Sequence, residues 1–112
     1  MSMHIQYTHT ARRDLRKIYA HIAHTLLVPD TAMALTKEMI AAVHSLAYLP
    51  ERNPLYKEEP WHSQGVRFLP VKRYLIFYTV QKDAGVVTVV RILFAERDIR
   101  RQLDETTEWE SL

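Results

Sequence analysis

From Ala11 onward, the spacing of apolar residues along this 112-residue chain changes once, from the period of a helix to that of a strand. Between Ala11 and Leu46, apolar residues recur every three or four positions, which predicts two amphipathic helices separated at Pro29. From Val66 to Phe94, runs rich in valine, isoleucine, tyrosine and phenylalanine predict three strands. This change of period favours an α+β domain.

A short alternating segment, Met3 to Tyr7, precedes the helices and predicts a further strand. We expect Thr10 and Asp30 to cap the two helices, and residues 81–85 to join the last two strands as a hairpin. The expected order is strand, helix, helix and a three-stranded antiparallel meander, followed by a short C-terminal helix or tail. Two helices covering one face of the sheet would make a two-layer fold.

Composition indicates one small globular domain, because 47% of the residues are hydrophobic and 25% are charged. We expect residues 1–103 to form that domain and residues 104–112 to form an acidic tail. The chain has no cysteine, no glycine-rich loop and no convincing metal-ligand spacing, so no metal or cofactor is expected. No secretion signal or long apolar run is present, which favours a cytoplasmic protein without membrane association.

The net charge of +2 hides an uneven distribution. Residues 67–101 carry eight basic and three acidic residues, whereas residues 102–112 carry four acidic and no basic residues. This asymmetry points to an anionic partner or surface. The alternative is that these charges neutralise each other in the folded chain, with the acidic tail folding back against the basic third.

Alternation in the last two strands predicts which side chains face the helices. We expect the purely apolar set to do so: Leu75, Phe77, Val90, Ile92 and Phe94. Tyr74, Tyr78 and Arg91 would then lie on an open face. Aromatic groups beside an arginine make such a face a candidate binding surface, although tyrosines in strands are more often part of the core.

Three motifs in this half of the chain resemble a known family. Arg67 precedes a short strand, residues 74–78 read Tyr-Leu-Ile-Phe-Tyr, and the Val-Arg-Ile-Leu of residues 90–93 leads to Arg97 and Asp98. This pattern resembles the carboxyl-terminal half of ParE-like toxins in the RelE/ParE superfamily. The amino-terminal half agrees more weakly, and the resemblance covers about residues 5–103.

The resemblance implies the RelE/ParE-like fold and the toxin half of a bacterial type II toxin-antitoxin system. ParE-like members poison DNA gyrase and block replication, whereas RelE-like members cut messenger RNA on the ribosome. The expected function is that of a ParE-like toxin, which inhibits growth, stabilises a plasmid or chromosome, and is neutralised by a cognate antitoxin in a hetero-oligomer. It would inhibit gyrase without a chemical step of its own.

The alternative is a RelE-like, ribosome-dependent nuclease. Such nucleases tend to have an arginine directly after the strand tyrosine and a tyrosine near the carboxyl end, where this chain has Leu75 and Leu103. Leucine can neither transfer a proton nor stabilise charge on a phosphate. If the chain is a nuclease, the residues expected to act are Arg67, Tyr74 and Arg97, and a different set could add His62 and Tyr78.

The residues expected to bind the target or partner are the following: Arg67, Arg73, Tyr74, Arg91 and Arg97. Internal pairing is the structural alternative for the arginines, and for Arg91 in particular both roles are open. The first predicted helix also carries a basic face: Arg12, Arg13, Arg16 and Lys17. A solvated surface is its simplest interpretation, and contact with DNA is the alternative.

Overall fold

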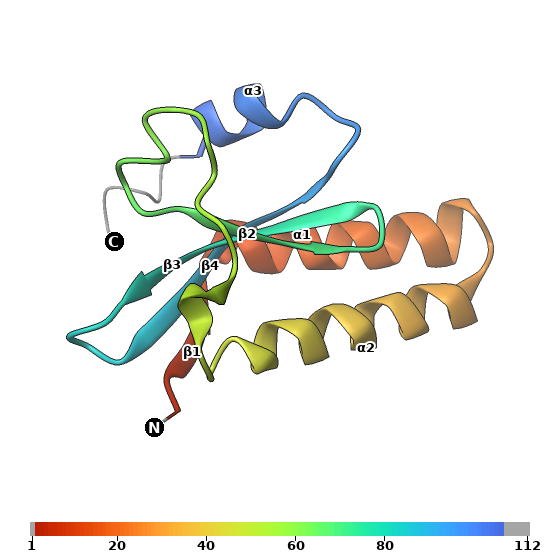
Figure 1. Cartoon of the computed structure of the whole chain (residues 1–112). Coiled ribbons are helices and arrows are strands. Elements are labelled where there is room, and N and C mark those ends of the chain that lie inside the picture. Colours follow the sequence, from red (N-terminus) through yellow and green to blue (C-terminus); the bar gives the residue numbers. More distant parts are fainter. Residues whose placement is uncertain (1, 107–112) are drawn as a thin grey trace.

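The computed structural model describes residues 2–106 and has the predicted order of elements (Figure 1). The strands and helices are β1 (His4–Tyr7), α1 (His9–Ala20), α2 (Pro29–Ser45), β2 (Arg67–Val71), β3 (Tyr74–Gln81), β4 (Val86–Phe94) and α3 (Ile99–Asp104). A π-helical segment, His21–Thr25, extends α1, and a 3-10 turn, Pro50–Arg52, follows α2. The predicted α+β fold, including its C-terminal helix, is confirmed.

The four strands form one mixed sheet in the order β1-β4-β3-β2. Strands β2, β3 and β4 make the predicted antiparallel meander, and β1 pairs parallel to β4. A parallel pair needs a crossover connection, and here the whole segment between β1 and β4, including both long helices, supplies it. The short first strand is therefore an edge strand, paired with the last one.

Both predicted helix caps are wrong. The side chain of Thr8, not Thr10, accepts a hydrogen bond from the backbone N–H of Ala11 at 3.0 Å, so α1 begins two residues earlier than its apolar pattern indicated. Helix α2 begins at Pro29, ahead of Asp30, and has no side-chain cap. Proline suits this first helical position because it has no N–H to leave unpaired.

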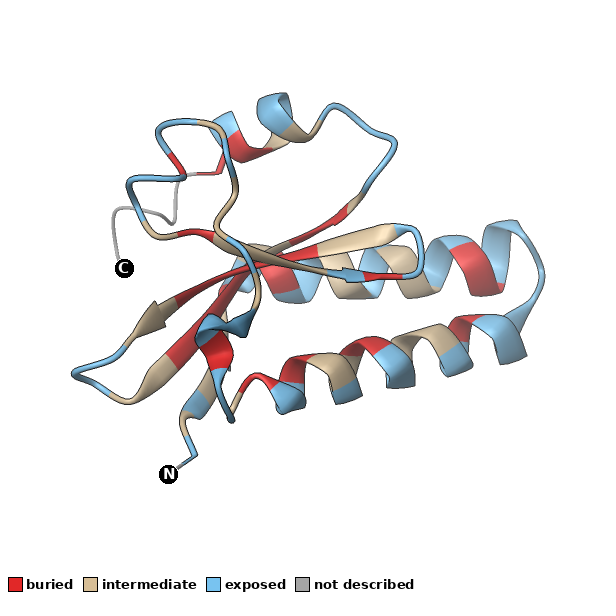
Figure 2. Cartoon of the chain, in the orientation of Figure 1, coloured by how far each residue is buried: buried red, intermediate tan, exposed pale blue. Residues whose placement is uncertain are grey.

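Helices α1 and α2 run antiparallel and cover one face of the sheet (Figure 1). The core beneath them consists of Ala11, Met39, Val43, Val71, Ile76, Val89 and Ile92. Figure 2 shows that the buried positions of α2 fall on one side of the helix, as its period of three to four residues requires. Among the described residues, no helix is long and apolar enough to cross a membrane.

The other face of the sheet is covered as well, by the loop between α2 and β2 and by α3. Trp61 from that loop and Leu103 from α3 are both almost fully buried there. They pack against Val66, which directly precedes β2, and against the following strand residues: Phe68, Leu75, Phe77, Val90 and Leu93. No open sheet face is left at these positions, so the fold has a covering layer that a plain two-layer arrangement lacks.

The predicted sheet faces are therefore wrong in part. Tyr74 packs against the helix-side core, and Tyr78 lies beneath the end of α2 with Leu46. Leu75, Phe77 and Val90 face the opposite layer. Strand β3 alternates regularly, and its face with Leu75 and Phe77 is the one that the loop and α3 cover. In β4, Phe77 pairs with Arg91 and Tyr78 with Val89, so Val90 is an extra residue in the ladder and does not share a face with Ile92. Such an irregularity breaks strict alternation, and it puts Val89 and Ile92 on the same side.

Candidate basic and aromatic surface

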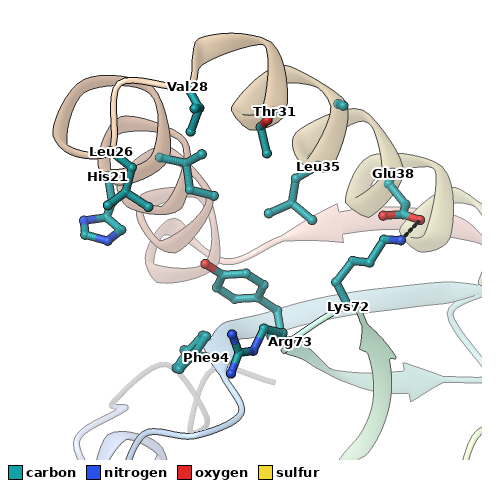
Figure 3. A pocket seen from close by; sticks show the side chains of 12 residues that line it. His21, Leu26, Val28, Thr31, Leu35, Glu38, Lys72, Arg73 and Phe94 are labelled. Carbon is teal, nitrogen blue, oxygen red and sulfur yellow. Dashed lines mark ion pairs between the residues drawn. The ribbon is translucent and has the colours of Figure 1, made fainter.

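A groove of about 800 Å³ lies between the helical pair and the start of β3 (Figure 3). Its lining is mainly apolar on the helix side, with Leu26, Val28 and Leu35, and aromatic on the sheet side, with Tyr74 and Phe94. Leu26 and Val28 are 56% and 42% exposed, which is unusual for large apolar side chains. The groove thus joins the tip of the helical pair to the segment that resembles the toxins.

Tyr74 lies at the centre of the sheet side of this groove, where β3 begins. Its ring packs edge-on against Phe94, with 5.4 Å between the ring centroids. The guanidinium of Arg73 lies 5.6 Å from the centre of the Phe94 ring and pairs with Glu96. Burial raises the pKa of the Tyr74 hydroxyl, and the nearby Arg73 and Arg97 offset part of this rise. Tyr74 is therefore a protonated hydrogen-bond donor near neutral pH.

Arg97 faces a second, adjoining hollow of about 370 Å³. Tyr74 and Phe94 border both hollows, and Lys17 and His21 reach the second one from the helix side. Arg97 is exposed, and within residues 2–106 its side chain forms no ion pair. The structure therefore brings Arg73, Tyr74 and Arg97 together, as the sequence predicted for three of its five contact residues.

Arg67 lies elsewhere, at the opposite end of β2 from the turn that leads to Tyr74. It pairs with Tyr78 in the ladder, whereas Tyr74 pairs with Val71. Four residues of strand correspond to about 13 Å along the sheet. The guanidinium donates to the backbone carbonyls of Glu51 and Asn53, at 3.1 and 2.6 Å. Arg67 thus anchors the loop after α2 and is separated from the Tyr74 surface.

Arg91 is the most enclosed of the four arginines, with 12% of its side chain exposed. It makes a two-pronged contact with Asp14 of α1, at 2.7 and 3.1 Å. Its other nitrogen donates to the carbonyl of Gln102 and to the hydroxyl of Thr106, at 3.0 and 2.9 Å. Arg91 therefore connects α1, β4 and the α3 segment, which corresponds to the structural alternative for this residue.

The wider nuclease set is also dispersed. Tyr78 is fully buried, and its hydroxyl donates to the carbonyl of Pro50 at 2.5 Å and accepts from Asn53 at 3.0 Å. Burial raises the pKa of Tyr78, so its proton is firmly held. A ring nitrogen of His62 lies 3.1 Å from the carbonyl oxygen of Tyr56, in the loop. Both side chains have partners within the fold.

Sequence reasoning missed the helix side of this surface. The run Leu26-Leu27-Val28 before Pro29 was a usable signal, because three consecutive apolar residues at a predicted turn have no obvious core position. Leu27 is 77% exposed and has a left-handed backbone, with φ of 58°. The contributions of Lys17 and His21 carried no such signal, because only the packing of α1 on the sheet places them beside Arg97.

Pairing of charges separates the basic third from the rest of the chain. Seven of the eight cations between residues 67 and 101 have a carboxylate partner, and Arg97 is the eighth. Surface pairs of this kind contribute little stability, but each reduces the local positive potential. The four basic residues of α1 form no ion pair within the described range. No group of three histidine or acidic side chains there is arranged as a metal site.

The sequence model of a protein family matches most of the chain. This family is the ParE toxin of the type II toxin-antitoxin system parDE, and the match covers residues 5–99. No curated protein matches the sequence.

Solved structures with the same fold come from three bacteria. The chromosomal ParDE toxin-antitoxin system from P. aeruginosa has a chain that is 23% identical, with a TM-score of 0.69, covering 85% of this chain and 98% of that one. A chain of the toxin-antitoxin complex RelBE2 from Mycobacterium tuberculosis is 20% identical, with a TM-score of 0.61, and the match covers 86% of this chain and 95% of that one. A double mutant of the E. coli toxin RelE in the free state is 16% identical, with a TM-score of 0.64, and the match covers 96% of this chain and 97% of that one.

At these identities the structural matches establish the fold, which ParE and RelE toxins share. The family match adds the narrower assignment, because it spans β1, both long helices and the whole meander. The chain therefore belongs to the family of ParE toxins of type II toxin-antitoxin systems.

Proposed function

We propose that this chain is a cytoplasmic toxin that binds and inhibits DNA gyrase, and that a cognate antitoxin neutralises it. The observation that supports this proposal is that Arg67, one of the three residues expected to act in a nuclease, is engaged within the fold, and that Leu75 stands where such nucleases tend to have an arginine. Arg67 and Tyr78 hold the loop after α2, and Leu75 packs in the layer beneath α3. The cluster that is left, Arg73 and Tyr74 with Arg97, suits protein recognition, for which tyrosine and arginine are favoured anchors.

Inhibition of gyrase by this surface would need no chemical step of the toxin's own. Arg97 is exposed and has no ion pair among residues 2–106, so its guanidinium is available for a carboxylate of the target. Tyr74 offers a protonated hydroxyl beside it, and Phe94 supports the tyrosine ring. We expect Arg97 to contribute most to affinity and Arg73, which already pairs with Glu96, to contribute less.

The test combines two assays of the purified protein. Gyrase supercoiling and cleavage-complex reactions measure the first function, and in-vitro translation with mapping of messenger RNA ends measures the nuclease alternative. We expect inhibited supercoiling and intact messenger. New messenger ends without an effect on gyrase would refute the proposal and support the nuclease.

Two single variants locate the contact. Arg97→Ala should weaken gyrase inhibition about tenfold or more, as loss of an interface anchor does. Arg100→Ala is the matched control, because Arg100 is an exposed arginine in the same segment but already pairs with Glu58. Equal effects of the two variants would argue against a specific role for Arg97.

We further propose that the antitoxin fills the 800 Å³ groove with an apolar segment, in a helical or extended form. The exposed side chains of Leu26 and Val28 would then be covered in the complex. Edge strand β2 offers a second contact. On its side away from β3, the described backbone partners are Pro54 and Leu55, and these reach only its first two residues.

The antitoxin contact can be tested by co-purification with the product of an adjacent or overlapping small reading frame. Leu26→Lys should reduce recovery of the complex, because it puts a charge into the apolar groove. Leu49→Lys is the control, since Leu49 is 79% exposed and is not part of the groove lining. Loss of the complex in both variants would place the contact elsewhere.

A further inference from the structure

The basic face of α1 is an unexplained feature of the fold. It consists of Arg12, Arg13, Arg16 and Lys17, all of which are exposed. Arg13 approaches a ring nitrogen of His9 at 3.3 Å, but none of the four forms an ion pair within residues 2–106. This concentration of unpaired cations contrasts with the paired charges of the sheet.

Helix stability does not account for these residues. Arg12 and Arg16, and likewise Arg13 and Lys17, are like charges four positions apart, an arrangement that destabilises a helix slightly. The first turn of α1 contains no acidic residue to favour its amino end. Asp14 is the one acidic residue of the helix, and Arg91 holds both of its oxygens. The fold therefore bears an internal repulsion that only an external anion would relieve.

The arrangement of the four cations suits a row of phosphates. Residues four apart in a helix rise about 6 Å along its axis, so the face presents two parallel pairs of cations. Three of the four are arginines, whose planar groups can donate two hydrogen bonds to one phosphate. A convex helix surface needs no pocket to contact a nucleic-acid backbone, which binds mainly through such cations.

A hollow of about 390 Å³ lies next to this face, between α1 and α2, and its lining includes the apolar side chains of Leu15 and Ile40. Arg12 and Arg16 border it from α1, His44 borders it from α2, and Tyr7 adds a hydroxyl. Burial raises the pKa of Tyr7, so the hydroxyl keeps its proton and can donate a hydrogen bond, although Arg12 offsets part of the rise. The basic face thus borders this hollow at its rim, and the cations on the exposed helix surface remain the groups that can contact phosphates.

We propose that the basic face of α1 binds the phosphate backbone of duplex DNA. Duplex is favoured over a single strand because the basic face itself offers no aromatic ring on which unpaired bases could stack, and the one tyrosine of α1, Tyr19, packs against the cluster of Ile22 and Ala32. Binding is independent of base sequence, since phosphate contacts carry no sequence information. The proposal does not depend on gyrase inhibition, and Lys17 is the one cation of the face that also borders the hollow at Arg97.

The test measures binding of the full chain to a labelled 20-base-pair duplex by fluorescence anisotropy. With about four phosphate contacts, the slope of log K against log salt concentration should lie near −3.6. This slope corresponds to a loss of affinity of about 10²-fold between 50 and 200 mM salt. Absence of binding at 50 mM salt would overturn the proposal.

Two variants with equal change in net charge locate the contact. The variant with R12Q, R13Q, R16Q and K17Q should lose duplex binding at 50 mM salt. The control with K37Q, K57Q, K82Q and R100Q removes four exposed cations elsewhere and should retain most of it. Circular dichroism checks that both quadruple variants fold. If the α1 variant does not fold, R12Q alone, which removes one contact, replaces it in the binding measurement. Equal losses in the two quadruple variants would mean that net charge alone is responsible.

Two further measurements separate this proposal from its alternatives. Arg97→Ala should bind the duplex as the unchanged chain does and still lose gyrase inhibition, so the two proposals can fail separately. A labelled glutamate-rich peptide, matched to the duplex in charge, should bind more weakly than the duplex. Tighter binding of the peptide through α1 would overturn the proposal in favour of an acidic protein partner.

Discussion

The meander and helix α1 both carry many cations, but the fold treats the two regions differently. Seven cations between residues 67 and 101 have an acidic side chain within pairing distance. These acidic side chains come from α1, α2, the loop after α2, the segment after β4 and the end of α3. On α1 the four exposed cations have no such partners in the described part of the chain. The region with the larger net charge in the sequence is therefore the better neutralised one in the structure.

The reason is topological. The meander lies at the centre of the molecule, where segments that are distant in sequence converge on it, as Asp14 does on Arg91 across 77 residues. Helix α1 packs its apolar stripe on the sheet and leaves its basic face outside this convergence. Net charge along the sequence therefore does not locate an anion-binding surface, whereas the distribution of unpaired charge does.

The largest expected effect on the free energy of unfolding concerns the buried ion pair of Arg91 and Asp14. Arg91→Ala should lower the free energy of unfolding by about 3–5 kcal/mol, because it leaves the carboxylate of Asp14 largely buried without its partner. Arg16→Ala on the basic face of α1 should change it by less than about 0.5 kcal/mol. Urea denaturation of both variants measures the difference.

A double-mutant cycle tests whether this effect belongs to the pair. Removing Asp14 and Arg91 together should cost less than the sum of the two single losses, because no buried charge is then left alone. If Arg91→Ala were no more destabilising than Arg16→Ala, the connection between α1, β4 and α3 would not be a source of stability.

A smaller difference in the free energy of unfolding is expected between variants that remove an exposed ion pair and variants that remove exposed unpaired cations. Arg73→Ala should cost at most about 1 kcal/mol, and less in 1 M salt, because both it and Glu96 are well exposed. Replacing Arg12 and Arg16 with glutamine should leave stability unchanged or raise it by a few tenths of a kcal/mol at low salt, since it removes repulsion. Denaturation at two salt concentrations measures both. A clear loss of stability in the α1 variant would show that the fold uses these cations.

The last effect appears only at alkaline pH and concerns the loop that covers the second sheet face. Burial, assisted by the hydrogen bond to Glu58, raises the pKa of Tyr56 to about 12 from an ordinary value of 10.0. The folded state therefore retains this proton more firmly, and the stability that it contributes is complete below pH 10 and is lost as the pH rises towards 12. In Tyr56→Phe this part of the decline should be absent, as denaturation midpoints between pH 8 and pH 11 would show. An identical decline in both proteins would contradict the assignment.

Most of the fold could be predicted from local pattern. The change of period at Val66 separates helices from strands, and the order of elements followed from it because consecutive elements tend to be neighbours in a small domain. The faces of β4 could not be predicted, since the extra residue at Val90 depends on pairing with β3. The covering of the second face was also hidden, because Trp61 lies in a loop without any period.

The sequence was sufficient to select the residues of the candidate site that lie at the end of the sheet. Tyr74 begins β3, Arg73 directly precedes it and Arg97 follows the end of β4, so the three residues meet at one end of these paired strands. Arg67 and Arg91 belong to the same sequence motif, but their partners, the carbonyls of Glu51 and Asn53 and the carboxylate of Asp14, come from distant segments. Whether such a residue binds an external target therefore depended on contacts that sequence spacing does not encode.

The boundary between the domain and the acidic tail stays a prediction. The described chain continues to Thr106, whose hydroxyl accepts a hydrogen bond from Arg91. The predicted folding back of the tail concerns Asp104, Glu105, Glu108 and Glu110 around Trp109. Asp104 and Glu105 lie at the end of α3, where Glu105 pairs with Arg101, whereas Glu108, Trp109 and Glu110 lie outside the described residues. Deletion of residues 107–112, with stability and gyrase inhibition as readouts, tests that hypothesis.

The sequence by itself determined the elements and their order, the aromatic strand at Tyr74 and the family to which the pattern points, because periodicity and motifs are local properties. The tertiary structure decided which charges are neutralised, which tyrosines are buried and which helix face remains available to an anion. These are pairwise properties, and their strength depends on distance and burial between residues far apart in the chain. The basic face of α1 is the clearest case, since its significance appeared only once the partners of all other cations were known.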